Sequence, residues 1–430
     1  MKSLLEFLNG AHTSFQAIAQ VRQVLKENNY EELIEGKDWN LKEGGRYFIV
    51  RNESSVIAFR IPKNDFNGFM IGASHSDSPS FKIKENPEIV QNGYVKLNVE
   101  GYGGMLMGPW LDRPLSVAGR VIVKEGDRFV TKLVDVDRDL LLIPNLAIHM
   151  DRGANKDHSW NVQIDMLPVL GEESAKGSFM KIVAQAAGVE EKDIISHDLF
   201  LYIRQKGTAW GADNEYISAP HLDDLQCGYG DLNGFLNSTD SASVPVLAIF
   251  DNEEVGSRTK QGADSSFLED TLTRICAAFH KDLRAAAASS FMVSADNAHA
   301  VHPAHPEKAD PVNRPLMNKG IVIKYNANQF YTTDGVSAAI FKEICAAVNV
   351  PVQTFTNRSD ERGGSTLGNI SNSHISLNTV DIGLPQLAMH SCYETAGVRD
   401  TEYLIKAMTE FFSSSASSWQ LLVDKTPAGL

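Results

Sequence analysis

Hydrophobic residues along the chain recur with a helical period in some segments and form continuous runs in others. Over residues 4–8 and 15–24 the hydrophobic positions recur every three or four residues, which predicts two helices, the second capped by Ser14. Two mostly apolar runs follow at residues 56–61 and 68–73, and such runs are typical of strands. The chain therefore begins with helices and continues into a sheet.

The pattern changes after about residue 85, where short strand-like runs are separated by glycine-rich or charged turns. Farther on, strand and helix patterns alternate, at residues 244–250, 272–280, 291–294, 336–348 and 401–412. Such alternation is typical of an α/β fold. We predict one α/β domain made of residues 1–85 and 219–430, interrupted by a β-rich domain at residues 86–218.

Composition narrows the class of protein. The 430 residues are 43% hydrophobic, which is enough for a sizeable core, and the formal net charge of -14 argues against a nucleic-acid or anionic-membrane partner. The four cysteines are far apart and form no CxxC pair, so they are expected to be reduced thiols. The first ten residues lack a signal-peptide pattern. These features predict a cytoplasmic protein.

Acidic and imidazole side chains recur after predicted strands and in nearby loops. The candidates for metal and water chemistry are His75, Asp77, His221, Asp223, Asp224, Asp251, Glu253, Glu254, Asp296 and His390. Such a mixed nitrogen and oxygen set suits zinc, with manganese or cobalt as substitutes, better than it suits calcium. The sequence predicts a metal site that activates water, although spacing alone leaves open whether these places meet.

Two of these motifs have a specific chemical use. His75 and Asp77 lie two residues apart, so in an extended segment they project from one face, and Asp77 can accept a hydrogen bond from the imidazole. Glu253 and Glu254 follow an apolar run, where one acid can bind metal while the other removes a proton from water. The alternatives are a polar strand end for the first pair and surface exposure for the second. Taken alone, Asp223 and Asp224 are more typical of a turn or helix cap.

Other polar clusters are weaker candidates. His299, His302 and His305 are interpreted as part of a polar loop rather than as metal ligands. The glycine-rich residues 363–368 lack the lysine of a phosphate-binding loop, so we expect them to offer backbone N–H groups to a peptide.

The ordered set of motifs resembles the aspartyl aminopeptidase family, within the wider group of exopeptidases that use two zinc ions. The resemblance covers most of the chain and is carried by residues 73–79 (ASHSDSP), 222–224 (LDD), 251–257 (DNEEVGS), 294–300 (SADNAHA) and 385–391 (PQLAMHS). It implies a zinc-exopeptidase-like α/β catalytic domain with a central mixed sheet. The β-rich insertion would then be a dimerisation domain.

The resemblance also implies a set of metal ligands. Asp223 would bridge two zinc ions, His75 and Asp296 would complete one site, and Glu254 and His390 would complete the other. A cis peptide bond is expected after the bridging aspartate.

The remaining roles concern catalysis and support of the ligands. The resemblance makes Glu253 the general base and Asp77 a catalytic residue that acts behind the ligands, and it leaves His221 outside the ligand set. In the implied mechanism, Glu253 takes a proton from the zinc-bound water and later passes it to the leaving amine.

Substrate and assembly are also implied by the resemblance. His149 matches a family histidine that a neighbouring subunit supplies to the active site, and Lys324 matches a substrate-binding lysine. Arg362 stands where many relatives have proline. The resemblance predicts removal of N-terminal Asp or Glu from peptides by a homo-oligomer, in which dimers form a tetrahedral dodecamer. Alternatives are a two-metal aminopeptidase of other specificity, a related exopeptidase or deacylase, and a peptide-binding shell without turnover.

Overall fold

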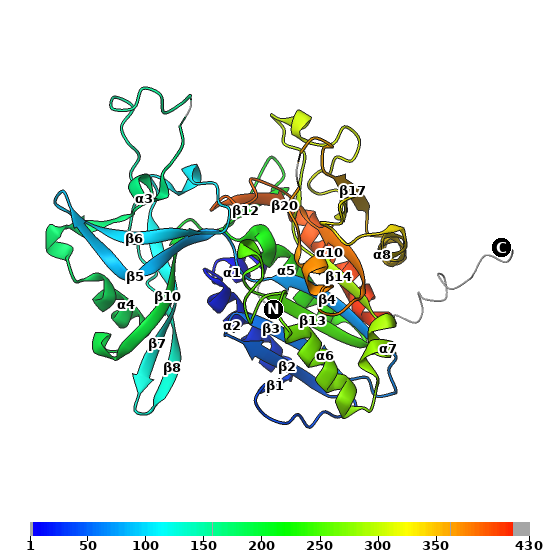
Figure 1. Ribbon diagram of the computed structural model, residues 1–430. Helices are drawn as coiled ribbons and strands as arrows, with labels where there is room; N and C mark the ends of the chain where they lie inside the picture. The colour runs from blue at the N-terminus through cyan, green and yellow to red at the C-terminus, as the bar shows by residue number, and fades with distance from the viewer. Residues whose placement is uncertain (1–2, 157, 362, 416–430) are drawn as a thin grey trace.

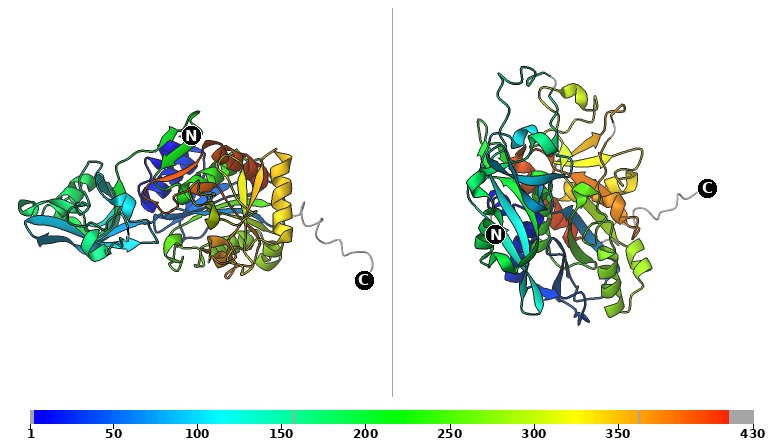
Figure 2. Two further views of the ribbon diagram at one scale, coloured as in Figure 1. Left: turned by 90° about the horizontal axis from the view of Figure 1, so that it is seen from above. Right: turned by 60° about the vertical axis from the view of Figure 1, so that its left-hand side comes forward.

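The chain folds into two lobes that lie side by side (Figures 1 and 2). The computed structural model describes residues 3–156, 158–361 and 363–415. The larger lobe holds both ends of the described chain and a central mixed sheet, while the smaller lobe is built around a second sheet. Arg362 lies outside the described residues.

The central sheet contains nine strands within the described part of the chain. In spatial order they are β1 (Glu31–Leu33), β2 (Arg46–Arg51), β3 (Ser55–Arg60), β13 (Val244–Phe250), β4 (Phe69–His75), β14 (Phe291–Ala295), β18 (Asn378–Gly383), β16 (Ile321–Tyr325) and β17 (Val352–Thr356). Strands β13, β4, β14 and β18 run parallel, whereas β3 and β16 pair antiparallel with their neighbours β13 and β18. The predicted α/β fold with a mixed sheet is confirmed.

Helices cover both faces of the central sheet, which explains why its middle strands are continuously apolar. Every residue of β3, β4, β13 and β14 is buried, as expected for strands covered on two sides. One core contains residues of α1 (Leu4–Leu8), α2 (Ser14–Glu27), α5 (Leu222–Asn237), α8 (Gly335–Ala347) and α10 (Val398–Ser413). The other core contains residues of α6 (Phe267–Ala278), α7 (Leu283–Ala288) and α9 (Leu367–Ser371).

The smaller lobe is built on an antiparallel sheet, called the outer sheet below. Its strands, in spatial order, are β8 (Arg128–Asp135), β7 (Leu115–Glu125), β10 (Ile194–Ile203), β5 (Ser80–Gln91), β6 (Tyr94–Tyr102) and β9 (Val169–Glu172). Helix α4 (Phe179–Ala187) packs into the same core through Phe179 and Val183, and α3 (Val162–Asp165) lies near β6. The domain boundaries at residues 86 and 218 stay a prediction.

A small sheet lies beside the central sheet. Its strands are β11 (Thr208–Trp210), β12 (Tyr216–Ala219), β20 (Glu394–Gly397), β19 (Pro385–Leu387) and β15 (Ala298–His299). Strand β12 leads into α5, and β19 and β20 flank His390. Because β12 and β19 both pair with β20, this sheet brings the start of α5 near His390, which is distant in sequence.

Two local predictions need correction. The cap of α2 is Thr13, whose side chain accepts a hydrogen bond from the Phe15 N–H, and the predicted cap Ser14 is the first helical residue. Helix α6 begins at Phe267, before the predicted residue 272, because Phe267 and Leu268 also pack into the core.

Two expectations from composition can be compared with the structure. All four cysteines are free, as predicted, and all four are buried. Within the described residues, no helix combines the length and the apolar character that crossing a membrane requires.

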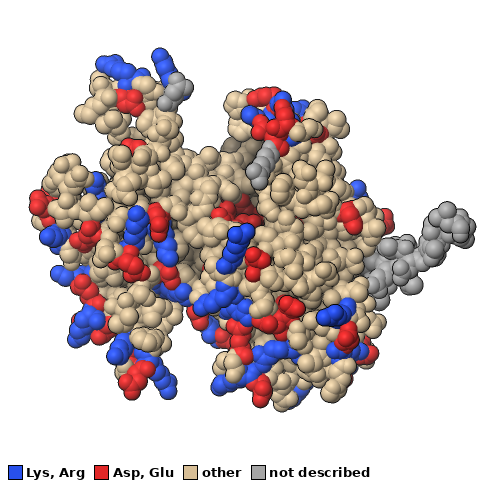
Figure 3. Space-filling view, viewed as in Figure 1, with Lys and Arg blue, Asp and Glu red and all other residues tan. Residues whose placement is uncertain are grey.

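Lys, Arg, Asp and Glu are scattered over both lobes of the face in Figure 3, and acidic side chains gather at the foot of the hollow between the lobes.

Candidate active site

The predicted metal-binding side chains come from segments that meet at one edge of the central sheet. His75 is the last residue of β4, Glu253 and Glu254 follow β13, and Asp296 follows β14. These three strands are parallel neighbours, so their carboxyl ends lie at the same edge, where open α/β sheets bind ligands. Asp223, near the start of α5, and His390, between β19 and β20, reach the same place.

Asp223 lies at the centre of this cluster, with one imidazole beside each of its carboxylate oxygens. Its Oδ1 is 3.6 Å from His75 Nε2, and its Oδ2 is 3.5 Å from His390 Nε2. Asp296 Oδ1 lies 3.9 Å from His75 Nε2, and Glu254 Oε2 lies 3.3 Å from His390 Nε2. Two of the three potential metal-binding groups among the described residues share Asp223, and each of these two has the nitrogen and oxygen atoms to hold one metal ion; the third group is His75, Glu253 and Glu254.

The charges and hydrogen bonds of the cluster fit bound cations. Asp223 Oδ1 and Glu254 Oε1 are buried, yet neither has a hydrogen-bond partner among the described residues. Burial and the neighbouring carboxylates, Asp223 first among them, raise the pKa of Glu254 far above its usual range. A buried carboxylate without a partner is costly, so metal ions would supply the missing charge. Zinc takes this mixture of imidazole and carboxylate ligands at about 2.0–2.2 Å.

The outer nitrogens of the two imidazoles are held by main-chain oxygens. His75 Nδ1 lies 3.0 Å from the carbonyl oxygen of Asp77 and 3.4 Å from that residue's carboxylate. His390 Nδ1 lies 2.7 Å from the carbonyl oxygen of Gly104. Because a carbonyl only accepts hydrogen bonds, each Nδ1 donates and each Nε2 is left to face Asp223. The predicted Asp77 carboxylate is therefore the more distant acceptor for His75.

The Asp77 carboxylate instead holds the turn that carries the two glutamates. It accepts hydrogen bonds from the main-chain N–H groups of Glu253, at 3.1 Å, and Glu254, at 3.2 Å. The hydroxyl of Tyr102, from the outer sheet, donates to Asp77 Oδ2 at 2.6 Å. Sequence reasoning missed Tyr102, since nothing in the alternating pattern of β6 separates it from an ordinary strand residue.

Glu394 is a second residue that the sequence analysis missed. Its side chain is 2% exposed, its Oε1 accepts the His390 N–H at 2.7 Å, and its Oε2 accepts the Asp223 N–H at 2.9 Å. One carboxylate therefore fixes the backbone of two members of the metal cluster. The only sequence signal is an acid in a short segment that proves to be buried.

The peptide bond between Asp223 and Asp224 is cis, as the resemblance implied. Asp224 Oδ2 accepts the main-chain N–H of His75 at 3.1 Å, so this acid also supports the cluster.

Glu253 faces a cavity of about 480 Å³ that contains the cluster. Burial, together with the carboxylates of Asp296, Asp77 and Asp223, raises the pKa of Glu253 to about 8. Residues 364–366 of the glycine-rich loop also line this cavity.

Comparison with known proteins decides the family. Residues 7–412 match the family described as "Aminopeptidase I zinc metalloprotease (M18)". The chain belongs to the M18 family. A "Probable M18 family aminopeptidase 2" from Clostridium acetobutylicum is 46% identical over 424 residues, which are 96% of this chain and 98% of the relative. The protein of that name from Pseudomonas aeruginosa strain UCBPP-PA14 is 38% identical over 425 residues, with the same coverage.

Solved structures agree with this assignment. A chain in the cryo-EM structure of the Ape4 and Nbr1 complex has a TM-score of 0.94 and 35% identity, covering 97% of this chain and 86% of that one. The S. cerevisiae mApe1 dodecamer has a TM-score of 0.87 and 27% identity, covering 98% of both chains. The predicted resemblance to aspartyl aminopeptidases is confirmed, and this chain is a zinc-dependent aminopeptidase.

The two predicted substrate-binding residues of this M18 aminopeptidase lie in different places. Lys324 lines the cavity and is 3% exposed. Its Nζ donates to the Asp296 carbonyl oxygen at 2.7 Å and to that of Asn297 at 3.3 Å. His149 is exposed in a turn of the smaller lobe and does not line the cavity within the described part of this chain.

The histidines that the sequence analysis did not assign as metal ligands lie outside the candidate metal cluster. Neither His221 nor His299, His302 or His305 belongs to a potential metal-binding group among the described residues. His299 does line the cavity of this M18 aminopeptidase, while His302 and His305 lie in an adjoining pocket.

Proposed function

We propose that this M18 aminopeptidase removes N-terminal residues from peptides, with a preference for Asp and Glu, and that it uses two zinc ions bridged by Asp223. The observation that carries the proposal is the position of Asp223 between two imidazoles, which gives two ligand groups with one shared member. His75 and Asp296 complete one group, and Glu254 and His390 complete the other.

When bound, zinc supplies the Lewis acid that polarises the scissile carbonyl and lowers the pKa of a water molecule. Glu253 is then the general base: its side-chain oxygens take the proton of the attacking water and return it to the leaving amine. Asp77 supports this role because it holds the Glu253 main-chain N–H, which fixes the start of the side chain beside the cavity.

Lys324 is the residue we propose for acidic specificity. An ammonium group has three N–H donors, and carbonyl oxygens of the chain accept two of them. The Lys324 Nζ also lies 3.6 Å from Asp296 Oδ2, so a substrate carboxylate would share the third N–H with Asp296. The cavity is otherwise rich in carboxylates. A positive charge among them suits an acidic N-terminal side chain better than an apolar one. His149 would come from a neighbouring copy of the chain.

We also infer a homo-oligomer, in which dimers formed by residues 86–218 assemble into a tetrahedral dodecamer in the cytoplasm. Support comes from three large apolar side chains that are exposed around His149, namely Leu146, Ile148 and Met150 at 58%, 44% and 76%. The similar mApe1 chain is itself a dodecamer. Native mass spectrometry should therefore detect twelve subunits, and a monomer that is fully active would overturn the inference.

Zinc content tests the two-metal proposal. We expect two ions per subunit in the reconstituted protein by elemental analysis, about one after His390→Ala, and fewer still after Asp223→Ala, because only Asp223 belongs to both groups. A single ion per subunit in the unchanged protein would contradict a bridged pair.

Specificity is tested with unblocked dipeptides headed by Asp, Glu or Leu. We expect Asp and Glu to be preferred, and Lys324→Met to lower kcat/KM for the Asp peptide by about tenfold or more while changing the Leu peptide less. Lys319→Met, at an exposed position, is the matched control. A preference for Leu would keep the metal mechanism and overturn the specificity.

A further inference from the structure

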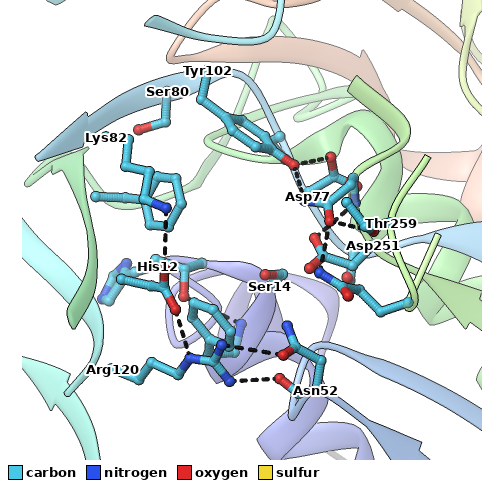
Figure 4. A pocket seen from close by; sticks show the side chains of 18 of the residues that line it. His12, Ser14, Asn52, Asp77, Ser80, Lys82, Tyr102, Arg120, Asp251 and Thr259 are labelled. Carbon is cyan, nitrogen blue, oxygen red and sulfur yellow. Dashed lines mark hydrogen bonds and ion pairs between the residues drawn. The ribbon is translucent and has the colours of Figure 1, made fainter. Parts of the chain in front are cut away.

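A second cavity, of about 540 Å³, lies between the outer sheet and the central sheet, behind Asp77 (Figure 4). Within the described residues it shares no lining residue with the metal-site cavity. Its size suits a small molecule, since ligand pockets commonly enclose about 300–1,000 Å³. The proposed peptidase reaction gives this space no role.

One wall of the cavity carries a surplus of positive charge. Lys82 Nζ lies 3.0 Å from Asp198 Oδ1, and Arg120 Nε lies 2.9 Å from Asp198 Oδ2, so two cations share one carboxylate. Arg120 also donates to the main-chain and side-chain oxygens of Asn52. Lys82 makes a single such contact among the described residues, which leaves N–H donors for a ligand.

The facing wall carries two carboxylates, and burial together with the neighbouring Asp77 raises the pKa of Asp251 to about 7. Asp77 and Asp251 are 4% and 3% exposed, and both line the cavity opposite Lys82 and Arg120, as Figure 4 shows. Opposite charges on facing walls complement a molecule that has a carboxylate at one end and an ammonium group at the other.

The space between the charged walls is partly apolar. Phe15 and Phe200 line it, and the Phe200 ring packs edge-on against Tyr102 at 5.5 Å between centroids. An aliphatic side chain of moderate length would bury its surface there.

From these three features we propose that this cavity binds a free α-amino acid with an apolar side chain, its carboxylate beside Lys82 and its ammonium group toward Asp77 and Asp251. Free amino acids are what an aminopeptidase releases, so the ligand belongs to the class of its own products. The inference requires only the established family activity, not the proposed acidic preference or metal number.

A bound amino acid would be close to the side chains that hold the turn of Glu253 and Glu254. Tyr102 and Asp77 line the cavity, and Asp77 accepts the N–H groups of Glu253 and Glu254. Occupancy therefore has a direct route to the turn, and we expect it to change kcat rather than compete with the peptide.

The test is to soak crystals of the zinc-loaded protein in L-selenomethionine and to locate selenium by its anomalous signal. The proposal predicts selenium between Phe15 and Phe200, whether or not a second molecule occupies the metal-site cavity. Selenium in the metal-site cavity alone, or at neither place, would overturn it. This readout is independent of peptide hydrolysis, so failure of the proposed function would be seen separately.

A matched pair of lysine variants tests the contact in solution. Lys82→Met should weaken binding of L-methionine to this cavity at least tenfold in calorimetry, and Arg120 would still neutralise Asp198. Lys84→Met is the control, because Lys84 is two residues away on the same face of β5 and does not line the cavity among the described residues. Equal binding by all three proteins would overturn the assignment of Lys82.

Two analogues test the need for both charges. Methioninol lacks the carboxylate and 4-(methylthio)butanoate lacks the ammonium group, so each should bind at least tenfold more weakly than L-methionine in the Lys82-dependent titration. If 4-(methylthio)butanoate binds as tightly, the amino-acid assignment is wrong. A change in kcat with added methionine, measured for any unblocked dipeptide that the protein cleaves, should likewise disappear in Lys82→Met, and its persistence there would contradict transmission from this cavity.

Discussion

At the scale of single residues, the site depends on carboxylates that hold main-chain N–H groups as much as on those that face the metal cluster. Asp77 holds the N–H groups of Glu253 and Glu254, and Glu394 holds those of Asp223 and His390. Each of these acids holds the backbone of two functional residues. Replacing Asp77 or Glu394 should therefore weaken zinc binding or catalysis although no metal ligand is removed.

Glu253→Gln tests the proposed base. The amide keeps the size of the side chain but cannot take the water's proton, so we expect kcat to fall by about 10²–10⁴-fold. Zinc content and assembly should be unchanged, as measured by elemental analysis and native mass. Activity within a few fold of the unchanged protein would exclude Glu253 as the base.

Glu394→Gln tests the support of the metal cluster. The main-chain N–H groups of Asp223 and His390 both donate to the Glu394 carboxylate, and in the variant one of them would face an NH₂ group instead of an oxygen. We therefore expect zinc affinity to fall by about 10–100-fold in a chelator competition assay. Glu402→Gln, at an exposed position of α10, should keep the original affinity. Unchanged affinity in both variants would show that Glu394 has no such role.

Sequence reasoning selected the candidate metal ligands because several of them follow recognisable strands, and the resemblance supplied the roles we expect of them. Tyr102 and Glu394 escaped because their partners are distant in sequence: Tyr102 is 25 residues from Asp77, and Glu394 is 171 residues from Asp223. The sequence does not show whether Lys324 is buried, and only the fold shows that β16 buries it.

At the scale of elements, the middle of the central sheet was the most predictable part. β4, β13 and β14 are buried throughout, so their sequences are continuous apolar runs. Helix starts were less predictable, because the Thr13 cap of α2 and the early start of α6 depend on single side chains. Helix α4 was not predicted within the β-rich region, where its apolar residues resemble those of strands.

The packing of α5 against α10 gives a stability prediction. A methyl group added at Gly234 would lie 2.5 Å from Met408 Cβ and 2.9 Å from the Met408 main-chain carbon. Gly234→Ala should therefore lower the free energy of unfolding by about 1–3 kcal/mol, measured by denaturant titration. Gly335→Ala, where a methyl group would meet no atom within 4 Å, is the control. Equal stability of the two variants would contradict the close helix contact.

His197 on β10 gives a pH prediction. The residue is buried, its ring nitrogens have no hydrogen-bond partner among the described residues, and burial lowers its pKa below 6.5 despite nearby Glu85 and Asp198. Below about pH 6.5 the unfolded chain then binds more protons than the folded one, so stability falls as the pH falls.

The Tm between about pH 7.5 and 5.5 measures this effect. His197→Gln should lose less Tm over the interval than the unchanged protein, and His302→Gln, at an exposed position, should lose as much. The same loss in all three proteins would show that His197 does not carry the pH dependence.

At the scale of the whole molecule, the two lobes meet at the candidate active site. Tyr102 and Gly104, at and just beyond the end of the outer-sheet strand β6, contact Asp77 and His390. The smaller lobe therefore contributes directly to the geometry of the catalytic lobe. This contact gives a physical reason why a change in the position of the smaller lobe would alter turnover.

The most direct test of the account is hydrolysis of an unblocked Asp-headed dipeptide and of its N-acetylated form, by zinc-reconstituted and EDTA-treated protein. We predict turnover of the unblocked peptide that EDTA abolishes and added zinc restores, with no turnover of the acetylated form. Turnover of the acetylated peptide at a similar rate, or turnover that survives removal of zinc, would contradict a zinc aminopeptidase mechanism at this site.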